Sequence, residues 1–246
     1  MDIWMVFAVL CAYFVKGMCG FANTLVFSTI LSFRESNLNI SPVELLTGYP
    51  SNILIAFWER KSLSLRICLP LSAMVVAGSV PGAFLLKNGD VGWIKILFGF
   101  AVAGIGAELY VREQKGTGKK GKSSPVALGI LGLLSGLLCG LFGIGALLAA
   151  YVGRTTQDNS AFRGNLCIVF LVENTFRVFL YAKLGILTWE ICKTSLCLMP
   201  FMLAGLGAGI FFTGKCSEQF VRRAVVWLLM ASGVFLVWSN MSVLFW

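Results

Sequence analysis

The sequence predicts an all-α polytopic membrane protein with two inverted structural repeats, each a broken, re-entrant helix pair followed by three transmembrane helices. The first observation behind this prediction is composition: 58% of the 246 residues are hydrophobic and only 13% are charged. A soluble domain carries about one quarter charged residues. The apolar excess is too large for one water-soluble core, so the chain is expected to cross a lipid bilayer.

The second observation is the length of the apolar stretches. They fall at about residues 3–33, 43–58, 67–86, 91–111, 126–153, 163–182, 190–213 and 219–240. Most have the ~17–25 residues that a helix needs to cross the hydrocarbon. The first is too long for one crossing and too short for two, and a polar, glycine-containing segment (Lys16–Asn23) interrupts its centre. The fifth has a similar interruption at Cys139–Ala146, so both are expected to be broken helices.

The third observation is an internal likeness. A basic segment at 112–124 divides the chain into a first repeat at 1–111 and a second at 125–246, and is expected to be a cytoplasmic linker. Four features recur in order: Lys16-Gly17-xx-Gly20 and Cys139-Gly140-xx-Gly143, Asn52 and Asn174, Lys61 and Lys183, and Gly78-xxx-Gly82 and Gly205-xxx-Gly209. Their order and nearly constant offset predict an internal duplication.

Basic residues in the loops choose between parallel and inverted repeats, because positively charged loops stay in the cytoplasm. If each broken stretch crosses once, ten basic loop residues lie inside and eight outside. If each enters and leaves on one side, the counts become thirteen and five. The residues that move inside are Arg154, Arg163, Lys215, Arg222 and Arg223, and those that move outside are Lys183 and Lys193. The stronger bias favours inverted repeats.

Paired helix breaks at membrane depth are typical of secondary transporters, where half-helix N-termini face an anionic substrate. Here the half-helices are expected to begin near Ala22–Thr24 and Gly145–Ala146. Small residues at Gly20, Ala22, Gly143 and Gly145 would let a ligand approach the backbone. The alternative is that these glycines only permit close helix packing. We prefer a binding role for the two interruptions and the packing role for the Gly78 and Gly205 pairs.

Ionisable residues inside a membrane are candidates for function. Lys16 adjoins the first interruption, where it would balance substrate charge or, alternatively, extend to the membrane interface. Glu173 and Arg177 are four residues apart and therefore share one helix face. They are either a structural ion pair, or Arg177 binds an oxyanion while Glu173 couples transport to protons. Asn52 and Asn174, with the neighbouring Ser51 and Thr175, are expected to line the substrate cavity.

Several classes of function are disfavoured. The chain has no histidine, which removes Ser–His catalysis and His-ligated metals, so we expect neither an enzyme nor a metal or cofactor site. The eight cysteines form no CxxC pair and are expected to be small buried hydrophobic residues. The net charge of +9 is assigned to cytoplasmic loops rather than to nucleic-acid binding. The first ten residues lack a basic region before the apolar run, so no signal peptide is expected.

The repeated Gly-xx-Gly-x-small-small element, early in each half of a chain divided by a basic loop, resembles the sulfite exporter TauE/SafE family of membrane permeases. The second copy, Gly140-Leu-Phe-Gly143-Ile-Gly145-Ala146, is close to the usual form, whereas the first has Ala22-Asn23 where glycines are usual. The resemblance covers about residues 10–240. It implies export of sulfite, sulfoacetate or a related organosulfonate across the bacterial inner membrane.

The sequence thus indicates a multi-pass secondary transporter that moves a small oxyanion by alternating access. Its expected partners are the anion and the lipid bilayer, with a homodimer left open and nucleic acid excluded. A passive anion channel and a non-transporting membrane scaffold are the alternatives.

Overall fold

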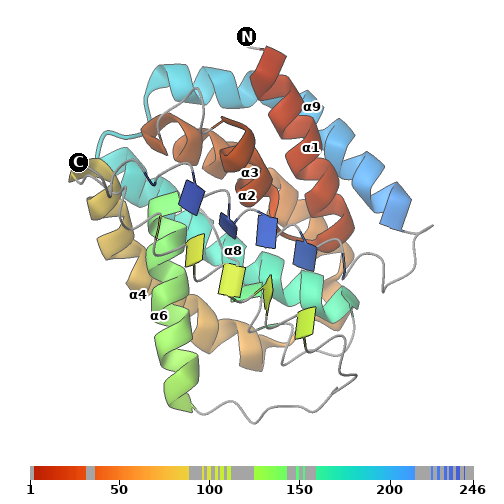
Figure 1. The fold of residues 1–246 in the computed structure, drawn as a ribbon, viewed down its shortest axis with the longest axis vertical. Coiled ribbons are helices and arrows are strands. Elements are labelled where there is room, and N and C mark those ends of the chain that lie inside the picture. Colours follow the sequence, from red (N-terminus) through yellow and green to blue (C-terminus); the bar gives the residue numbers. More distant parts are fainter. Residues whose placement is uncertain are drawn as a thin grey trace.

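The computed structural model describes residues 3–31, 37–88, 125–142 and 159–213, together with individual residues within 96–111, 148–152 and 223–241. The longer described elements are α1 Ile3–Cys19, α2 Asn23–Leu31, α3 Asn37–Trp58, η1 Arg60–Ser62, α4 Leu65–Asn88, α6 Pro125–Phe142, α8 Asn159–Lys183 and α9 Trp189–Thr213 (Figure 1). No β-strand occurs among these elements. The predicted all-α class is therefore confirmed.

The first apolar stretch is broken where the sequence predicts a break. α1 ends at Cys19 and α2 begins at Asn23, and Gly20 and Ala22 between them have positive φ angles of 83° and 72°. Such left-handed conformations cannot continue a right-handed helix. With a rise of about 1.5 Å per residue, α1 is about 26 Å long and α2 about 14 Å long. The two parts pack against each other but are unequal in length.

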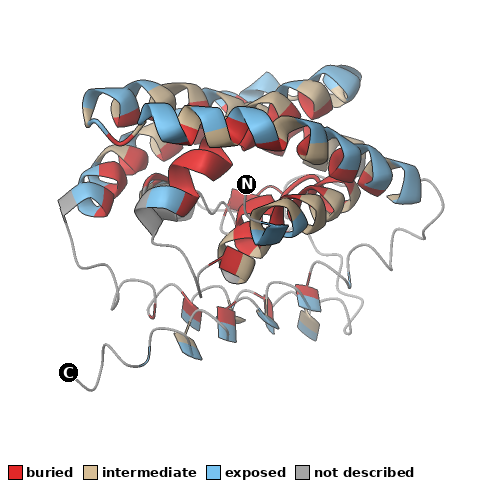
Figure 2. Cartoon of the chain, turned by 90° about the horizontal axis from the view of Figure 1, so that it is seen from above, coloured by how far each residue is buried: buried red, intermediate tan, exposed pale blue. Residues whose placement is uncertain are grey.

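Three of the described helices are long and apolar enough to cross a membrane: Cys68–Lys87, Ser160–Lys183 and Trp189–Thr213. The outer faces of these helices carry exposed residues (Figure 2), and several of these are large and apolar. Leu69, Phe179 and Leu196 are each about two-thirds exposed, at 67%, 68% and 65%. Polar and charged side chains are instead found in the interior. Apolar surface around a polar interior is the arrangement that a lipid environment requires.

Helices from the first half of the chain pack mainly against helices from the second half. α1 lies along α9, α6 lies along α4, and α8 runs through the centre against α3 and α4 (Figure 1). α3 also contacts α9. If α1, α3 and α4 correspond to α6, α8 and α9, then every one of these contacts has its counterpart in the other half. A duplicated unit folds in this way.

Close contacts at glycine residues show the same pairing of helices between the two halves. A Cβ on Gly205 would meet the Leu10 carbonyl oxygen and the Phe14 nitrogen of α1. A Cβ on Gly78 would meet the carbonyl oxygen of Leu133 and the nitrogen of Leu137 in α6. Leu133 and Leu137 stand at the places that Leu10 and Phe14 occupy in the aligned first half. The packing role expected for Gly78 and Gly205 is confirmed.

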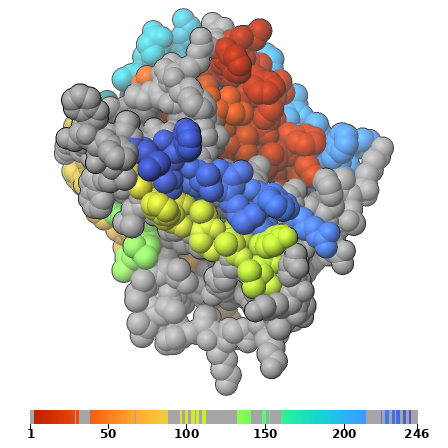
Figure 3. All heavy atoms as spheres, viewed as in Figure 1, coloured from red at the N-terminus to blue at the C-terminus, as the bar shows by residue number. Residues whose placement is uncertain are grey.

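The last segments of the two halves also meet. Gly99 and Gly233 approach closely enough that a Cβ on Gly99 would lie 2.7 Å from the Gly233 carbonyl oxygen. The rings of Tyr110 and Trp227 contact edge to face, with centroids 5.7 Å apart. In Figure 3 the described residues of these two segments form adjacent bands across one face.

One helix differs from its expected bounds in a way that affects the site. The apolar stretch at 43–58 is part of a longer helix, since α3 begins at Asn37. Polar residues at its start hide this helix from a hydropathy pattern. Glu44 consequently lies two turns inside α3, where only 4% of the residue is exposed.

Candidate functional site

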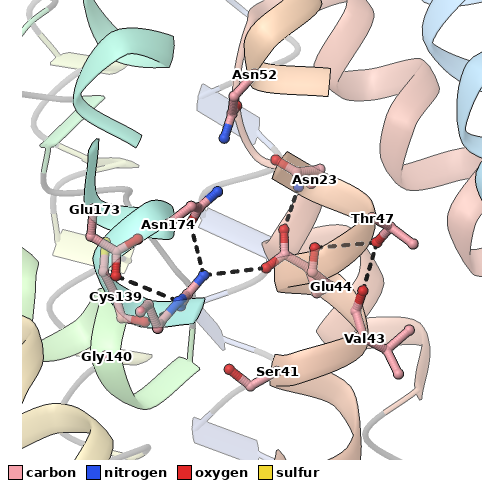
Figure 4. A network of polar contacts seen from close by, with 12 residues as sticks. Asn23, Ser41, Val43, Glu44, Thr47, Asn52, Cys139, Gly140, Glu173 and Asn174 are labelled. Atoms are coloured by element: carbon pink, nitrogen blue, oxygen red, sulfur yellow. Dashed lines mark hydrogen bonds and ion pairs between the residues drawn. The ribbon is translucent and has the colours of Figure 1, made fainter. Parts of the chain in front are cut away.

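Buried polar residues from five helices meet in the interior of the protein. Lys16 comes from α1, and Asn23 and Thr24 come from the start of α2. α6 contributes the backbone carbonyl oxygens of Cys139 and Gly140, while α3 and α8 provide the largest shares of polar side chains. The polar side chains of α3 in this region are Ser41, Glu44, Thr47, Ser51 and Asn52, and those of α8 are Glu173, Asn174, Arg177 and Tyr181. We call this set the central polar network, and Figure 4 shows part of it.

Lys16 lies at the end of α1 and is buried among the helices, with 1% of its surface exposed. Its Nζ donates a hydrogen bond of 2.7 Å to Oδ1 of Asn52 and lies 5.8 Å from the centroid of the Tyr13 ring. An ammonium group has three donors. No carboxylate forms an ion pair with Lys16 among the residues that the structure describes. The alternative in which Lys16 extends to the interface is therefore wrong.

Arg177 forms the other cationic centre. Its Nη2 donates to Oδ1 of Asn174 at 3.1 Å, and its Nη1 donates to the Cys139 carbonyl oxygen. The Arg177 Nε lies 3.5 Å from Oε1 of Glu173, as expected for residues four apart on one helix face. Both of these atoms are buried, and neither makes a hydrogen bond to the residues that the structure describes. The ion pair predicted between Glu173 and Arg177 is thus present, with hydrogen-bonding capacity left on each partner.

Glu44 connects the start of α2 to Arg177. The side-chain amide of Asn23 donates to Oε1 of Glu44 at 2.5 Å, and Oε2 of Glu44 lies 3.8 Å from Nη2 of Arg177. Figure 4 shows the Asn23 and Glu44 side chains facing each other across the gap between their helices. Because the first turn of a helix carries unpaired N–H groups and a partial positive charge, it favours a carboxylate at this place.

Neighbouring hydroxyl groups hold the helices around this centre. The hydroxyl group of Tyr181 donates to the Gly140 carbonyl oxygen at 2.8 Å and also contacts the Ser41 hydroxyl at 3.0 Å. Tyr13 donates to Oγ1 of Thr47 at 3.0 Å. These bonds join α8 to α6 and α3, and α1 to α3, so they fix the spacing of the elements that carry the charges.

The structure brings together most residues expected from the sequence. Lys16, Asn23, Asn52, Glu173, Asn174 and Arg177 all belong to the central polar network, Thr24 lies beside Asn23, and Gly20 and Ala22 form the break itself. Ser51 is fully buried, and its hydroxyl bonds back to the Gly48 carbonyl oxygen within α3. The second interruption, with Gly143, Gly145 and Ala146, lies outside the described residues.

Glu44 is the charged residue of the central polar network that the sequence pattern did not reveal, and Ser41, Thr47 and Tyr181 were not identified from the sequence either. Glu44 stands at the edge of an apolar stretch, a place typical of interfacial residues. A helical period would have found it, because Ser41, Glu44, Thr47, Gly48 and Ser51 are spaced three or four apart and line one face of α3. Asn23, identified here from the glycine pattern, is its hydrogen-bond partner.

The structure describes seven of the eight cysteines, and none of these seven forms a disulfide bond. Cys19, Cys68, Cys139 and Cys167 are buried, as expected of small hydrophobic residues. Cys197 is exposed on the outer side of α9, so the expectation of burial is wrong for this residue. Within a membrane protein that surface is apolar, and a thiol is tolerated there as a weakly polar group.

A helical bundle with apolar outer surfaces, a broken first helix and a buried network of opposite charges is typical of membrane proteins of the transporter class. The chain belongs to the sulfite exporter TauE/SafE family, whose family model matches residues 5–236. It is therefore a membrane transporter of the sulfite-exporter type. No curated protein and no solved structure shows significant similarity to the chain.

Proposed function

We propose that this protein is a secondary transporter that exports a small sulfur-containing oxyanion across the bacterial inner membrane by alternating access. Sulfite, sulfoacetate and related organosulfonates are the substrates that family membership favours. The observation that carries the proposal is the placement of two buried cations, Lys16 and Arg177, in the network that adjoins the first turn of α2.

The chemistry of this network suits a sulfur oxyanion. Such an anion presents several acceptor oxygens, and it needs donors that face it from more than one side. Lys16 contributes an ammonium, Arg177 a guanidinium, and the start of α2 contributes backbone N–H groups together with the Thr24 hydroxyl. The amide groups of Asn52 and Asn174 orient the two cations through their Oδ1 atoms.

The inverted-repeat arrangement is part of this proposal. Support comes from the exchanged helix contacts, in which α1 and α9 pair as α6 and α4 do. In an inverted repeat, the broken stretch of the second half would present its own helix end to the same centre from the opposite side of the membrane. Rocking of one half against the other then opens the central polar network to each side in turn.

Counterflow in proteoliposomes tests the transport proposal. Vesicles that contain the purified protein and unlabelled sulfite should accumulate labelled sulfite from outside, because a carrier exchanges one bound anion for another. A channel allows net flux but produces no counterflow. Protein-free vesicles are the control for leakage.

A thermal-shift screen with sulfite, sulfate, thiosulfate, sulfoacetate, taurine and simple carboxylates identifies the substrate class. The transported anion should raise the apparent melting temperature of the wild-type protein, because it binds the folded state only. Lack of any shift, together with absence of counterflow, would instead favour a scaffold.

A further inference from the structure

Glu44 holds a place that the transport proposal leaves without a function. Its carboxylate accepts a hydrogen bond from Asn23 in the first turn of α2 and faces Arg177 from the other side. This is the position at which the sequence predicts a bound anion. In the present structure a carboxylate of the protein itself therefore occupies the environment suited to that anion.

Charged and titratable groups surround this carboxylate from several elements. They are Tyr13 and Lys16 of α1, Cys139 of α6, and Glu173, Arg177 and Tyr181 of α8. The Asn23 and Thr24 side chains add hydrogen-bond donors from α2. Among the buried groups that the structure describes, the formal charges are Lys16 and Arg177 against Glu44 and Glu173, so this network is neutral when both carboxylates are ionised.

The zero net charge of the central polar network restricts how an anion can bind there. A monoanion added to this buried network would leave one negative charge in excess, and an uncompensated buried charge is costly. It would also have to compete with Glu44 for Asn23 and Arg177. Both obstacles disappear together if Glu44 leaves its position and becomes neutral as the anion arrives.

We propose that Glu44 is a resident substitute for the transported anion, which displaces its carboxylate from Asn23 and Arg177 while Glu44 takes up one proton. This inference rests on the proposed function. The proton comes from the aqueous phase that delivers the anion and forms an O–H bond on the Glu44 carboxylate. It returns to water on the opposite side when the anion leaves and the ionised carboxylate binds Asn23 again.

Glu173 has a different role in this scheme. It shares α8 with Arg177, four residues away, so its distance from the guanidinium does not depend on movement between helices. It remains the fixed counter-ion of Arg177, whereas Glu44 reaches Arg177 across an interhelical gap. Proton coupling therefore belongs to Glu44 in place of Glu173, and transport of one monoanion with one proton is electroneutral.

The test compares sulfite binding by wild type, Glu44→Gln and Glu173→Gln in detergent at about pH 5.5 and about pH 8.5, on either side of neutrality. Sulfite titrates itself, but it does so identically for all three proteins, so ratios between proteins report on the side chains. At high pH, Glu44→Gln should bind sulfite about tenfold more tightly than wild type, because no carboxylate competes. At low pH the two affinities should converge, and Glu173→Gln should not reproduce this pattern.

Equal affinities of wild type and Glu44→Gln at high pH, or an unchanged pH dependence in Glu44→Gln, would overturn the inference. A failure of wild type to bind sulfite would instead refute the proposed function, so the two failures are distinct. If Glu44→Gln does not fold, wild-type proteoliposomes provide the second measurement. Their sulfite flux should respond to a pH gradient and not to a potassium-diffusion potential, and a potential-driven flux would contradict electroneutral coupling.

Discussion

Lys16 of α1 and Asn52 of α3 are joined inside the protein by a hydrogen bond of 2.7 Å from Nζ to Oδ1. The equivalent asparagine of the second half, Asn174, accepts a hydrogen bond of 3.1 Å from Arg177. Each asparagine thus holds one buried cation, although the two cations come from helices that do not correspond. If the two halves are repeats, the asparagines stand at matching positions and the two cations do not.

Replacement of Lys16 by Met is expected to abolish sulfite binding and to lower thermal stability. The methionine fills a similar volume, but it leaves Arg177 as the one buried cation among the described residues against Glu44 and Glu173, and removing one charge from a balanced buried set costs about 3–5 kcal/mol. Intrinsic tryptophan fluorescence reports the melting temperature, and the thermal-shift assay reports binding. Lys193→Met is a matched control, because Lys193 is exposed on α9. Normal sulfite binding by Lys16→Met would remove Lys16 from the site.

Arg177→Gln should destabilise the protein strongly. It leaves Glu44 and Glu173 buried without the guanidinium between them, and breaking a buried ion pair from one side costs about 3–5 kcal/mol. The double variant Arg177→Gln/Glu173→Gln restores neutrality with Lys16 and Glu44, so it should regain much of this stability.

The same pair of variants separates stability from binding. Neither should bind sulfite if Arg177 is a ligand of the anion. Sulfite binding by the stable double variant with wild-type affinity would reduce the Glu173–Arg177 pair to a structural ion bridge.

Ala22→Gly is expected to stabilise the protein. Ala22 has a φ of 72°, and a left-handed conformation costs a non-glycine residue about 1–2 kcal/mol. Part of this gain is offset by the greater flexibility of glycine in the unfolded chain. A rise in melting temperature without a change in sulfite affinity would show that the break in the first helix tolerates either residue. A fall would show that the Ala22 methyl group contributes more through burial than it costs in strain.

Sequence patterns predict the scaffold of this protein better than its centre. Helix class, the break near Ala22 and the close packing at Gly78 and Gly205 follow from hydropathy and from local rules about small residues, and these features need only neighbouring residues to be identified. The start of α3 at Asn37 does not follow from them, because polar residues there obscure a helix whose stability comes from its packing against α8 and α9.

The residues of the candidate site also fall into those that the sequence predicts and those that it does not. Residues marked by symmetry or by spacing, such as Asn52, Asn174 and the Glu173–Arg177 pair, can be identified from the chain alone. The contact between Asn23 and Glu44 joins α2 to α3 over 21 residues of the chain, and its partner atoms are fixed by the way these two helices pack against each other. Such interhelical contacts require the structure.

Glycine substitutions in α9 test the crossing of α1 and α9. A Cβ on Gly205 would lie 2.7 Å from the Leu10 carbonyl oxygen, which belongs to the backbone and cannot yield without separating the helices. Gly205→Ala should therefore destabilise the protein by about 1–3 kcal/mol, the usual cost of overpacking.

Gly207 provides the matched control, because it lies in the same helix and a Cβ there would meet no atom within 4 Å. Gly207→Ala should be neutral or stabilising by up to about 1 kcal/mol, the difference in helix propensity between the two residues. Gly205→Ala should therefore have a lower melting temperature than Gly207→Ala. Equal melting temperatures would mean that α1 and α9 can separate freely at this crossing, and that the paired packing of the two halves does not hold the transporter together.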